Sequence, residues 1–188
     1  TTKPTFKTLI ESSPGTSTLA NCSMIDKGFA ELYKDSKWVF GNIANLDPDI
    51  ARYIMKLGIK YSFVEFDYKL CKHRNPILYN FVEDEDCDYK ATDHGQFIQE
   101  FIGASQSTFF MSEAQRKIYE VELPETAEAN THILSSLFDD DFFTRINLLT
   151  EKYENQPRDN KWIVLGSNSW VKGALQSENW CKENDVDH

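Results

Sequence analysis

A charged run, EFDYKLCKHR (residues 65–74), follows an apolar, strand-like segment and contains groups that could do chemistry. Glu65 and Asp67 stand two residues apart, so in a strand they share one face, and we expect one of them to act as a general base. Lys69 and Arg74 could hold an anionic group beside them. The alternative is that the same residues form a charge-balanced strand exit that faces solvent.

A second stretch, GSNSWVKG (residues 166–173), could hold a phosphate group. Gly166 allows a tight turn after the apolar run WIVL, and the backbone N–H groups at the start of a helix attract anions. Lys172 would add a positive charge to a diphosphate, and Gly173 would let a ligand approach closely. The stretch lacks the G-x-x-x-x-G-K-[ST] pattern of a P-loop. An ordinary strand–glycine–helix corner is the alternative interpretation.

Two cysteines and two histidines form the one grouping with zinc-ligand residue types: Cys71, His73, Cys87 and His94. Their spacing matches no common zinc finger or ribbon, so buried or free thiols are the favoured interpretation, and we predict neither a metal nor a cofactor. Four cysteines in 188 residues are too few for a disulfide scaffold, which favours a reducing, cytoplasmic location.

The composition indicates an acidic globular chain with a substantial core. Apolar residues make up 40%, the formal charge is −10 and the isoelectric point is near 4.9. Such a surface repels the phosphodiester backbone and anionic membranes, so we expect no nucleic-acid partner. No segment reaches the roughly 20 apolar residues that span a bilayer, and the N-terminus has no secretory apolar region, so we expect no membrane span.

Strand and helix patterns alternate from about residue 37 onward, which predicts an α/β fold with a Rossmann-like parallel sheet flanked by helices. The clearest helix is capped by Asp47, begins at Pro48 and ends at Gly58. The segment 6–11, FKTLIE, could be a further strand. Expected strands are 37–41, 59–68, 107–112, 131–136 and 162–166, and expected helices are 24–34, 47–57, 95–105, 112–122, 139–154 and 171–184.

The order of elements in the last third is similar to the domain junction of GT-B glycosyltransferases. In the large retaining, family-4-like branch, a strand ends in a serine–glutamate step that opens a helix, as Ser112-Glu113 does here. A strand, an acidic and phenylalanine-rich stretch and a linker then lead to the nucleotide-sugar domain. The matching segments are FFMSEAQRKIYEVELPE, THILSSLFDDDFF and KWIVLGSNSWVKG, and WVFGNIANL with YSFVEFDYKLCKHR also resembles phage and bacterial members.

The resemblance implies a transferase that moves a sugar from a nucleotide-sugar donor to a sugar or glycan acceptor. Residues 1–156 would form the acceptor-side domain, in which Lys69 and Arg74 line the acceptor and Glu65 and Asp67 are catalytic. Residues 157–188 would be the linker and the first strand–helix unit of the donor domain, with Gly166, Lys172 and Gly173 on the donor diphosphate. Ser167 stands where this branch usually has an arginine, so another cation would have to supply that charge.

The chain stops before the rest of such a donor domain, so we expect a truncated enzyme that is inactive alone. The alternative is a non-catalytic Rossmann-like binding module. Exposure of its unfinished core would then favour a homodimer.

Overall fold

The structure is a computed structural model that describes residues 2–123, 130–135, 137–157, 161–164 and 173–187. It divides into two compact units, residues 1–140 and residues 141–188, which are considered separately. The predicted domain boundary between residues 156 and 157 stays a prediction.

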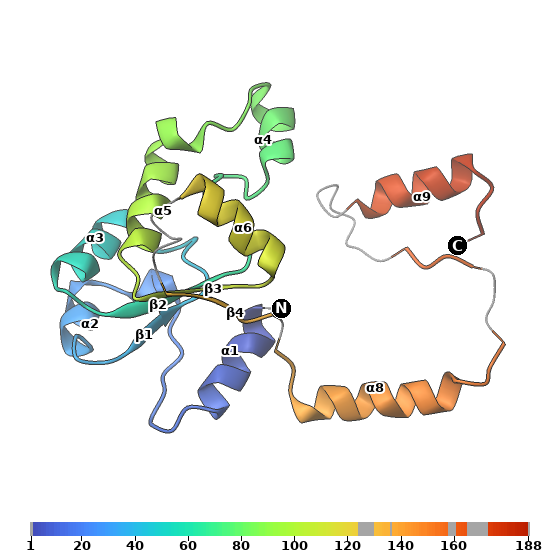
Figure 1. Cartoon of the computed structure of the whole chain (residues 1–188), viewed down its shortest axis with the longest axis horizontal. Coiled ribbons are helices and arrows are strands. Elements are labelled where there is room, and N and C mark those ends of the chain that lie inside the picture. The colour runs from blue at the N-terminus through green and yellow to red at the C-terminus, as the bar shows by residue number, and fades with distance from the viewer. Residues whose placement is uncertain (1, 124–129, 136, 158–160, 165–172, 188) are drawn as a thin grey trace. The chain divides into compact units, whose positions relative to one another are not determined.

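The first unit is built on a four-stranded parallel sheet (Figure 1). Each strand pairs with the one that follows it in the sequence, in the order β1-β2-β3-β4. Because parallel neighbours need crossover connections, helices lie between successive strands. The α/β prediction is confirmed. The strands are β1 (Trp38–Phe40), β2 (Tyr61–Glu65), β3 (Ser107–Phe110) and β4 (Thr131–Ile133).

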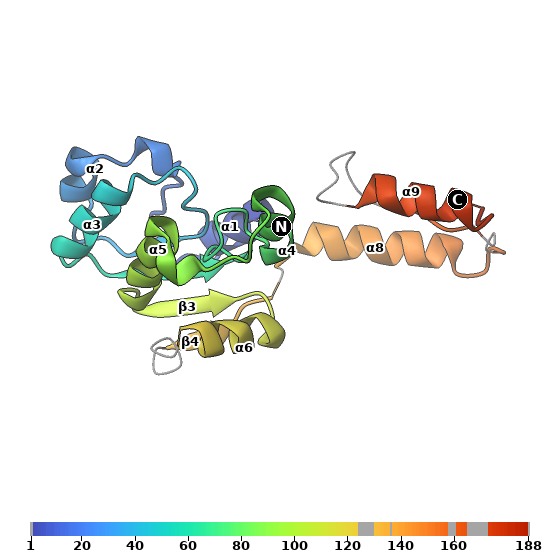
Figure 2. The same ribbon diagram turned by 90° about the horizontal axis from the view of Figure 1, so that it is seen from above.

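The crossover helices α3, α5 and α6 lie on one side of the sheet, and α1 lies on the other (Figure 1). Seen from above, α5 lies between α3 and α6. Helix α6 lies beside β4 (Figure 2). The segment between β2 and β3 is longer than the others and contains α4 and a 3-10 turn as well as α5. The elements are α1 (Thr2–Glu11), η1 (Cys22–Met24), α2 (Lys27–Leu32), α3 (Pro48–Lys56), α4 (Pro76–Glu83), η2 (Tyr89–Ala91), α5 (Asp93–Gly103) and α6 (Glu113–Glu122).

Short polar side chains fix where these helices begin. Asp47 accepts from the backbone N–H of Asp49 at the start of α3, and Ser112 accepts from that of Gln115 at the start of α6. Each bond satisfies an N–H that has no partner within the helix. Gly58 has φ +70° directly after α3, a conformation that glycine adopts freely, and so confirms the predicted helix end.

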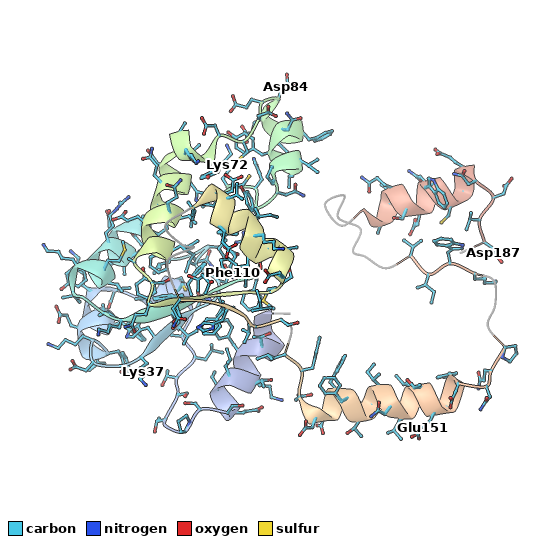
Figure 3. All side chains as sticks on the ribbon, in the orientation of Figure 1. Lys37, Lys72, Asp84, Phe110, Glu151 and Asp187 are labelled. Atoms are coloured by element: carbon cyan, nitrogen blue, oxygen red, sulfur yellow. The ribbon has the colours of Figure 1, made fainter. Side chains whose placement is uncertain are left out.

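Aromatic side chains from β1, β2 and α5 form the centre of the core. The ring of Tyr61 stacks on Phe101 at 4.6 Å between centroids, and Phe40 meets both rings edge-on. The Tyr61 hydroxyl donates to the carbonyl oxygen of Phe101, so this buried polar atom is satisfied. Phe110, labelled in Figure 3, is fully buried and packs against Tyr119 of α6 at 5.2 Å.

The expectation of a strand at residues 6–11 is wrong, because this segment lies in α1. Phe6 and Ile10 recur at helical spacing and their side chains are half-buried. The ring of Phe6 packs directly on Gly41, where a Cβ atom would collide with it, and stands 6.0 Å from Phe66.

The second unit contains the helices α8 (Asp140–Tyr153) and α9 (Ala174–Glu183). The first residue of α8, Asp140, is the last residue of the first unit. Residues 162–164 were expected in a strand but lie in neither a strand nor a helix. Instead, the backbone N–H of Trp162 donates to the carbonyl oxygen of Asp187 beyond α9, and the Trp162 and Trp180 rings stand 6.3 Å apart. Among the described residues, none of the helices combines the length and apolar character that crossing a bilayer requires.

Candidate functional site

The carboxylate of Glu65 lies at the carboxyl end of β2 and is fully buried. It accepts hydrogen bonds from Lys69 Nζ at 2.8 Å, from the Tyr119 hydroxyl at 2.7 Å and from the backbone N–H of Asp67 at 2.7 Å. A buried carboxylate without such partners would be strongly destabilising. Glu65 is therefore anchored by groups from its own strand exit and from α6.

Lys69 supplies the compensating charge from inside the protein. Its side chain is 4% exposed, and its ammonium group also stands 3.8 Å from Asp67 and 5.6 Å from the centre of the Phe63 ring. The backbone of Lys69 is held as well, since its N–H donates to the Tyr119 hydroxyl oxygen and His94 Nε2 lies 2.8 Å from its carbonyl oxygen. The lysine is thus fixed on every side by β2, α5 and α6.

Tyr119 connects α6 to this buried pair. Burial, and then the nearby Glu65 carboxylate, raise the pKa of Tyr119 well above its ordinary value, so the phenol remains a hydrogen-bond donor. A neutral donor here complements the negative charge of Glu65. We call Glu65, Lys69 and Tyr119 the buried triad.

Asp67 and Arg74 form a second, accessible layer over the buried triad. Arg74 donates to Asp67 Oδ2 at 3.1 Å, and the two side chains are 39% and 41% exposed. Gln115 of α6 fixes the Asp67 backbone, because its amide donates to the Asp67 carbonyl oxygen at 2.7 Å while its oxygen accepts from the N–H of Met111. Solvent therefore reaches one carboxylate and one guanidinium at this edge of the sheet.

Arg74 has a backbone conformation that L-residues rarely adopt, with φ +57°. We expect the free energy of unfolding of the Arg74→Gly variant to exceed that of Arg74→Ala by about 1 kcal/mol, because only glycine adopts this conformation without steric cost. Both variants lose the exposed Asp67 ion pair, so its contribution cancels. Urea denaturation measures the difference. The same two substitutions at Lys72, which lacks positive φ, serve as the control, and there the alanine variant should be at least as stable as the glycine variant. If alanine is also at least as stable as glycine at position 74, the backbone conformation of Arg74 does not favour glycine.

Of the seven predicted site residues, the structure brings four together: Glu65, Asp67, Lys69 and Arg74. Gly173 belongs to the second unit, where it precedes α9 with φ +71°, and no atom of the described residues beyond its chain neighbours lies within 4 Å of where a Cβ atom would stand. Gly166 and Lys172 lie outside the described residues, as does Ser167. The predicted grouping on the donor side therefore stays a prediction.

The two histidines of the grouping with zinc-ligand residue types have other partners. His73 Nε2 lies 2.7 Å from Glu83, and His94 faces the Lys69 carbonyl oxygen. Within the described part of the chain, no three His, Cys, Asp or Glu residues are grouped so that they could hold a metal ion.

Tyr119 and His94 were missed as members of the site. Both come from helices that lie far along the sequence from β2, and nothing local to them distinguishes a site residue from an ordinary helix position. Gln115 carried a signal, because it stands three residues after Ser112 as in a capping box. Its side chain reaches one residue further back, to Met111, and its other end holds Asp67.

The arrangement separates two chemical roles. Glu65 is buried among donors, so its charge fixes Lys69 and the strand exit. Asp67 is the carboxylate that a bound hydroxyl group could meet, and Arg74 is the adjacent cation. Such a pair suits a polar ligand with hydroxyl groups or a modest negative charge.

A scan against protein-family models found no match for this chain, and searches of the curated proteins and of the solved structures found none either.

Proposed function

We propose that this chain provides the acceptor side of a GT-B-type glycosyltransferase, which moves a sugar from a nucleotide-sugar donor to a sugar or glycan acceptor. The observation that carries the proposal is the exposed Asp67–Arg74 pair, held over the buried triad where β2 ends. Open parallel sheets bind ligands beyond the carboxyl ends of their strands, which is where this pair lies. The serine–glutamate step at Ser112 also supports it, since Ser112 starts α6 directly after β3.

In this proposal Asp67 accepts a hydrogen bond from the acceptor hydroxyl group and, as the general base, its proton during transfer. Arg74 binds a second oxygen of the acceptor and keeps the Asp67 side chain in place. Glu65 and Lys69 are positioning residues, because they hold the backbone on which Asp67 stands. Gly166, Lys172 and Gly173 would contact the donor diphosphate, with positive charge supplied by Lys172 and by backbone N–H groups.

A titration followed by two-dimensional NMR of the ¹⁵N-labelled chain tests the acceptor side. Neutral mono- and oligosaccharides are expected to shift the backbone signals of Asp67, Arg74 and Gln115. Arg74→Ala should weaken saccharide binding about tenfold, the loss that removal of one charged hydrogen bond produces. Arg52→Ala is the matched control, because Arg52 is also partly exposed, at 49% against 39% for Arg74, but pairs with Asp49 and Glu100 on α3 and α5.

The donor side is tested in the same experiment with UDP- and GDP-sugars. These should shift the signal of Gly173 and leave those of Asp67 and Arg74 unchanged. If no saccharide in the set moves the Asp67 and Gln115 signals, the acceptor-side proposal fails.

A non-catalytic binding module is the second candidate, and the burial of Glu65 favours it. Glu65 has no exposed atom, so of the two carboxylates predicted to be catalytic Asp67 is the one in contact with solvent. Asp67→Asn separates the two functions once the full transferase reaction is reconstituted with a donor domain. If the chain is a binding module, wild type and Asp67→Asn should bind the ligand equally well and neither should transfer a sugar. If it is part of an enzyme, wild type should transfer a sugar, and Asp67→Asn should still bind the ligand but no longer support transfer. Analytical ultracentrifugation of the chain tests the homodimer that the module hypothesis includes.

A further inference from the structure

Helix α4 is short but firmly bounded, and it lies at the upper edge of the first unit, away from the sheet (Figure 1). At its start, the side chain of Asn75 accepts hydrogen bonds from two backbone N–H groups of the first turn. At its end, Asp84 adopts a left-handed conformation with φ +56° (Figure 3). Tyr79 is the buried side chain of this helix, and the ammonium group of Lys72 lies 5.2 Å from the centre of its ring. One face of α4 is therefore fixed to the first unit.

The opposite face of α4 is apolar and exposed. Ile77 and Phe81 stand four residues apart, so they share one face of the helix, roughly opposite Tyr79. Ile77 is 81% exposed, Phe81 is 75% exposed, and Val82 beside them is 52% exposed. A helix on the surface of a globular protein ordinarily presents polar side chains outward. Three large apolar side chains therefore form an exposed apolar face on this short helix.

Acidic residues border this face on its C-terminal side. Residues 75–88 contain five Asp or Glu and no Lys or Arg. Glu83 pairs with Lys72 at 2.9 Å and lies 2.7 Å from His73 Nε2. Among the described residues, no salt bridge reaches the other four acids, which are Asp84, Glu85, Asp86 and Asp88.

Hydrogen bonds from α4 hold two of these carboxylates beside the helix. The Tyr79 hydroxyl group donates to Glu85 at 3.0 Å, and the side-chain amide of Asn80 donates to Asp86 at 3.2 Å. Both donors are neutral, so the carboxylates are positioned while their negative charge stays uncompensated. An apolar face bordered by such carboxylates is complementary to a partner segment that carries apolar and basic side chains together.

We propose that the α4 surface, which consists of Ile77, Phe81, Val82 and the acidic run 83–86, binds a basic amphipathic helix of a partner protein. The apolar side chains of that helix would cover Ile77 and Phe81. Its Lys or Arg side chains would pair with the carboxylates of the acidic run. The proposal does not depend on the proposed glycosyltransferase function.

The charge of this surface argues against three other occupants. In a symmetric contact with a second copy, each chain would present the same acidic run to the other, and the two runs would repel. An anionic membrane would be repelled by the same carboxylates. A metal ion is not favoured either, because no three His, Cys, Asp or Glu residues in the described part of the chain are grouped as metal ligands.

The test uses the folded full chain and the synthetic peptide KLLKKLLKKLLKKL, which as a helix has one leucine face and one lysine face. Fluorescence anisotropy of the labelled peptide measures its affinity. The peptide KAAKKAAKKAAKKA keeps the charge without the apolar face, and it should bind at least about tenfold more weakly. The peptide ELLEELLEELLEEL keeps the apolar face with the opposite charge, and it should not bind.

Two sets of variants locate the binding surface. Ile77→Ala combined with Phe81→Ala should weaken binding of the lysine–leucine peptide at least about tenfold, because apolar anchors carry much of the energy of such contacts. The matched control is Ile118→Ala combined with Val121→Ala, a pair of exposed apolar residues on α6, and it should leave the affinity unchanged.

The second set removes negative charge. Asp84→Asn combined with Asp86→Asn should weaken binding about threefold or more at low salt, and asparagine tolerates the left-handed conformation at position 84. The difference should vanish near 1 M salt, where the Debye length is only about 3 Å.

Several results would overturn the proposal. One is that the wild-type chain fails to bind the lysine–leucine peptide, or binds it no better than the lysine–alanine peptide. Another is an equal loss of affinity in the α4 and α6 double variants. A third is a wild-type dimer in sedimentation velocity that the α4 double variant dissociates, because a second copy would then be the occupant. The peptide comparison uses the wild-type chain, so it remains informative even if a variant fails to fold.

Discussion

Lys69→Met is expected to lower the free energy of unfolding of the first unit by about 3–5 kcal/mol, the typical cost of leaving one partner of a buried ion pair without the other. Glu65 would remain fully buried with only neutral donors, the Tyr119 hydroxyl and the Asp67 N–H, among the partners described above. Methionine fills most of the volume of the lysine stem, so the loss reports the charge and not a cavity. Urea denaturation followed by circular dichroism measures it.

Two further variants separate the charge from packing. Glu65→Gln combined with Lys69→Met should recover a large part of the loss, because no buried charge then remains uncompensated. Lys72→Met is the matched surface control: its ammonium group pairs with Glu83 with about half of the side chain exposed, so its removal should lower the free energy of unfolding far less than Lys69→Met does. Equal losses for Lys69→Met and Lys72→Met would show that the buried triad does not stabilise the fold.

Gly95→Ala should cost about 1–3 kcal/mol, the usual effect of forcing atoms into a packed site, and more if the backbone cannot move. A Cβ atom at Gly95 would collide with the carbonyl oxygen of Tyr89 and come within 2.7 Å of its carbonyl carbon. Both atoms belong to backbone, so no side-chain rotation relieves the contact. The first turn of α5 would have to move away from η2, and with it His94, which holds the Lys69 backbone.

Gly103→Ala on the same helix is the control for this prediction. Among the described residues, no atom outside its own helix backbone and chain neighbours lies within 4 Å of the Cβ position there, and alanine has the higher helix propensity, so this variant should gain up to about 1 kcal/mol. Thermal unfolding of the two variants side by side gives the comparison. If Gly95→Ala is as stable as Gly103→Ala, the close approach of η2 and α5 is not a real constraint on the fold.

Local signals were enough to predict most elements of the first unit. Asp47 and Ser112 cap helices because a short polar side chain can satisfy a helix N–H wherever the chain is placed. The α1 segment failed because FKTLIE contains apolar residues at both strand-like and helix-like spacing, and its packing on Gly41 decides between them. That contact joins residues far apart in the sequence and leaves no pattern within the segment.

Sequence patterns indicated that Glu65 and Asp67 lie close together, but not that Tyr119 and His94 join them or that the two acids differ in burial. The spacing of Glu65 and Asp67 indicated two neighbouring carboxylates, and rules for parallel sheets indicated the edge on which they lie. Their difference in burial depends on Tyr119, which is 54 positions from Glu65 and reaches it from another helix. A strand pattern alone treats the two acids alike, so it cannot tell the buried carboxylate from the exposed one.

The strand order β1-β2-β3-β4 also determines how the first unit can assemble. Each strand finds its partner in the next one along the chain, so the sheet can extend in the direction of synthesis without a later strand inserting between earlier ones. The residues paired in Trp38↔Tyr61 and in Thr108↔Thr131 are separated by short stretches of chain. The pairing Ser62↔Ser107 instead spans α4, η2 and α5. Because closing a longer loop costs more entropy, we expect the step that joins β2 to β3 to be the slowest to nucleate. The buried triad forms only once that step is complete, since Glu65 precedes it in the chain and Tyr119 follows it.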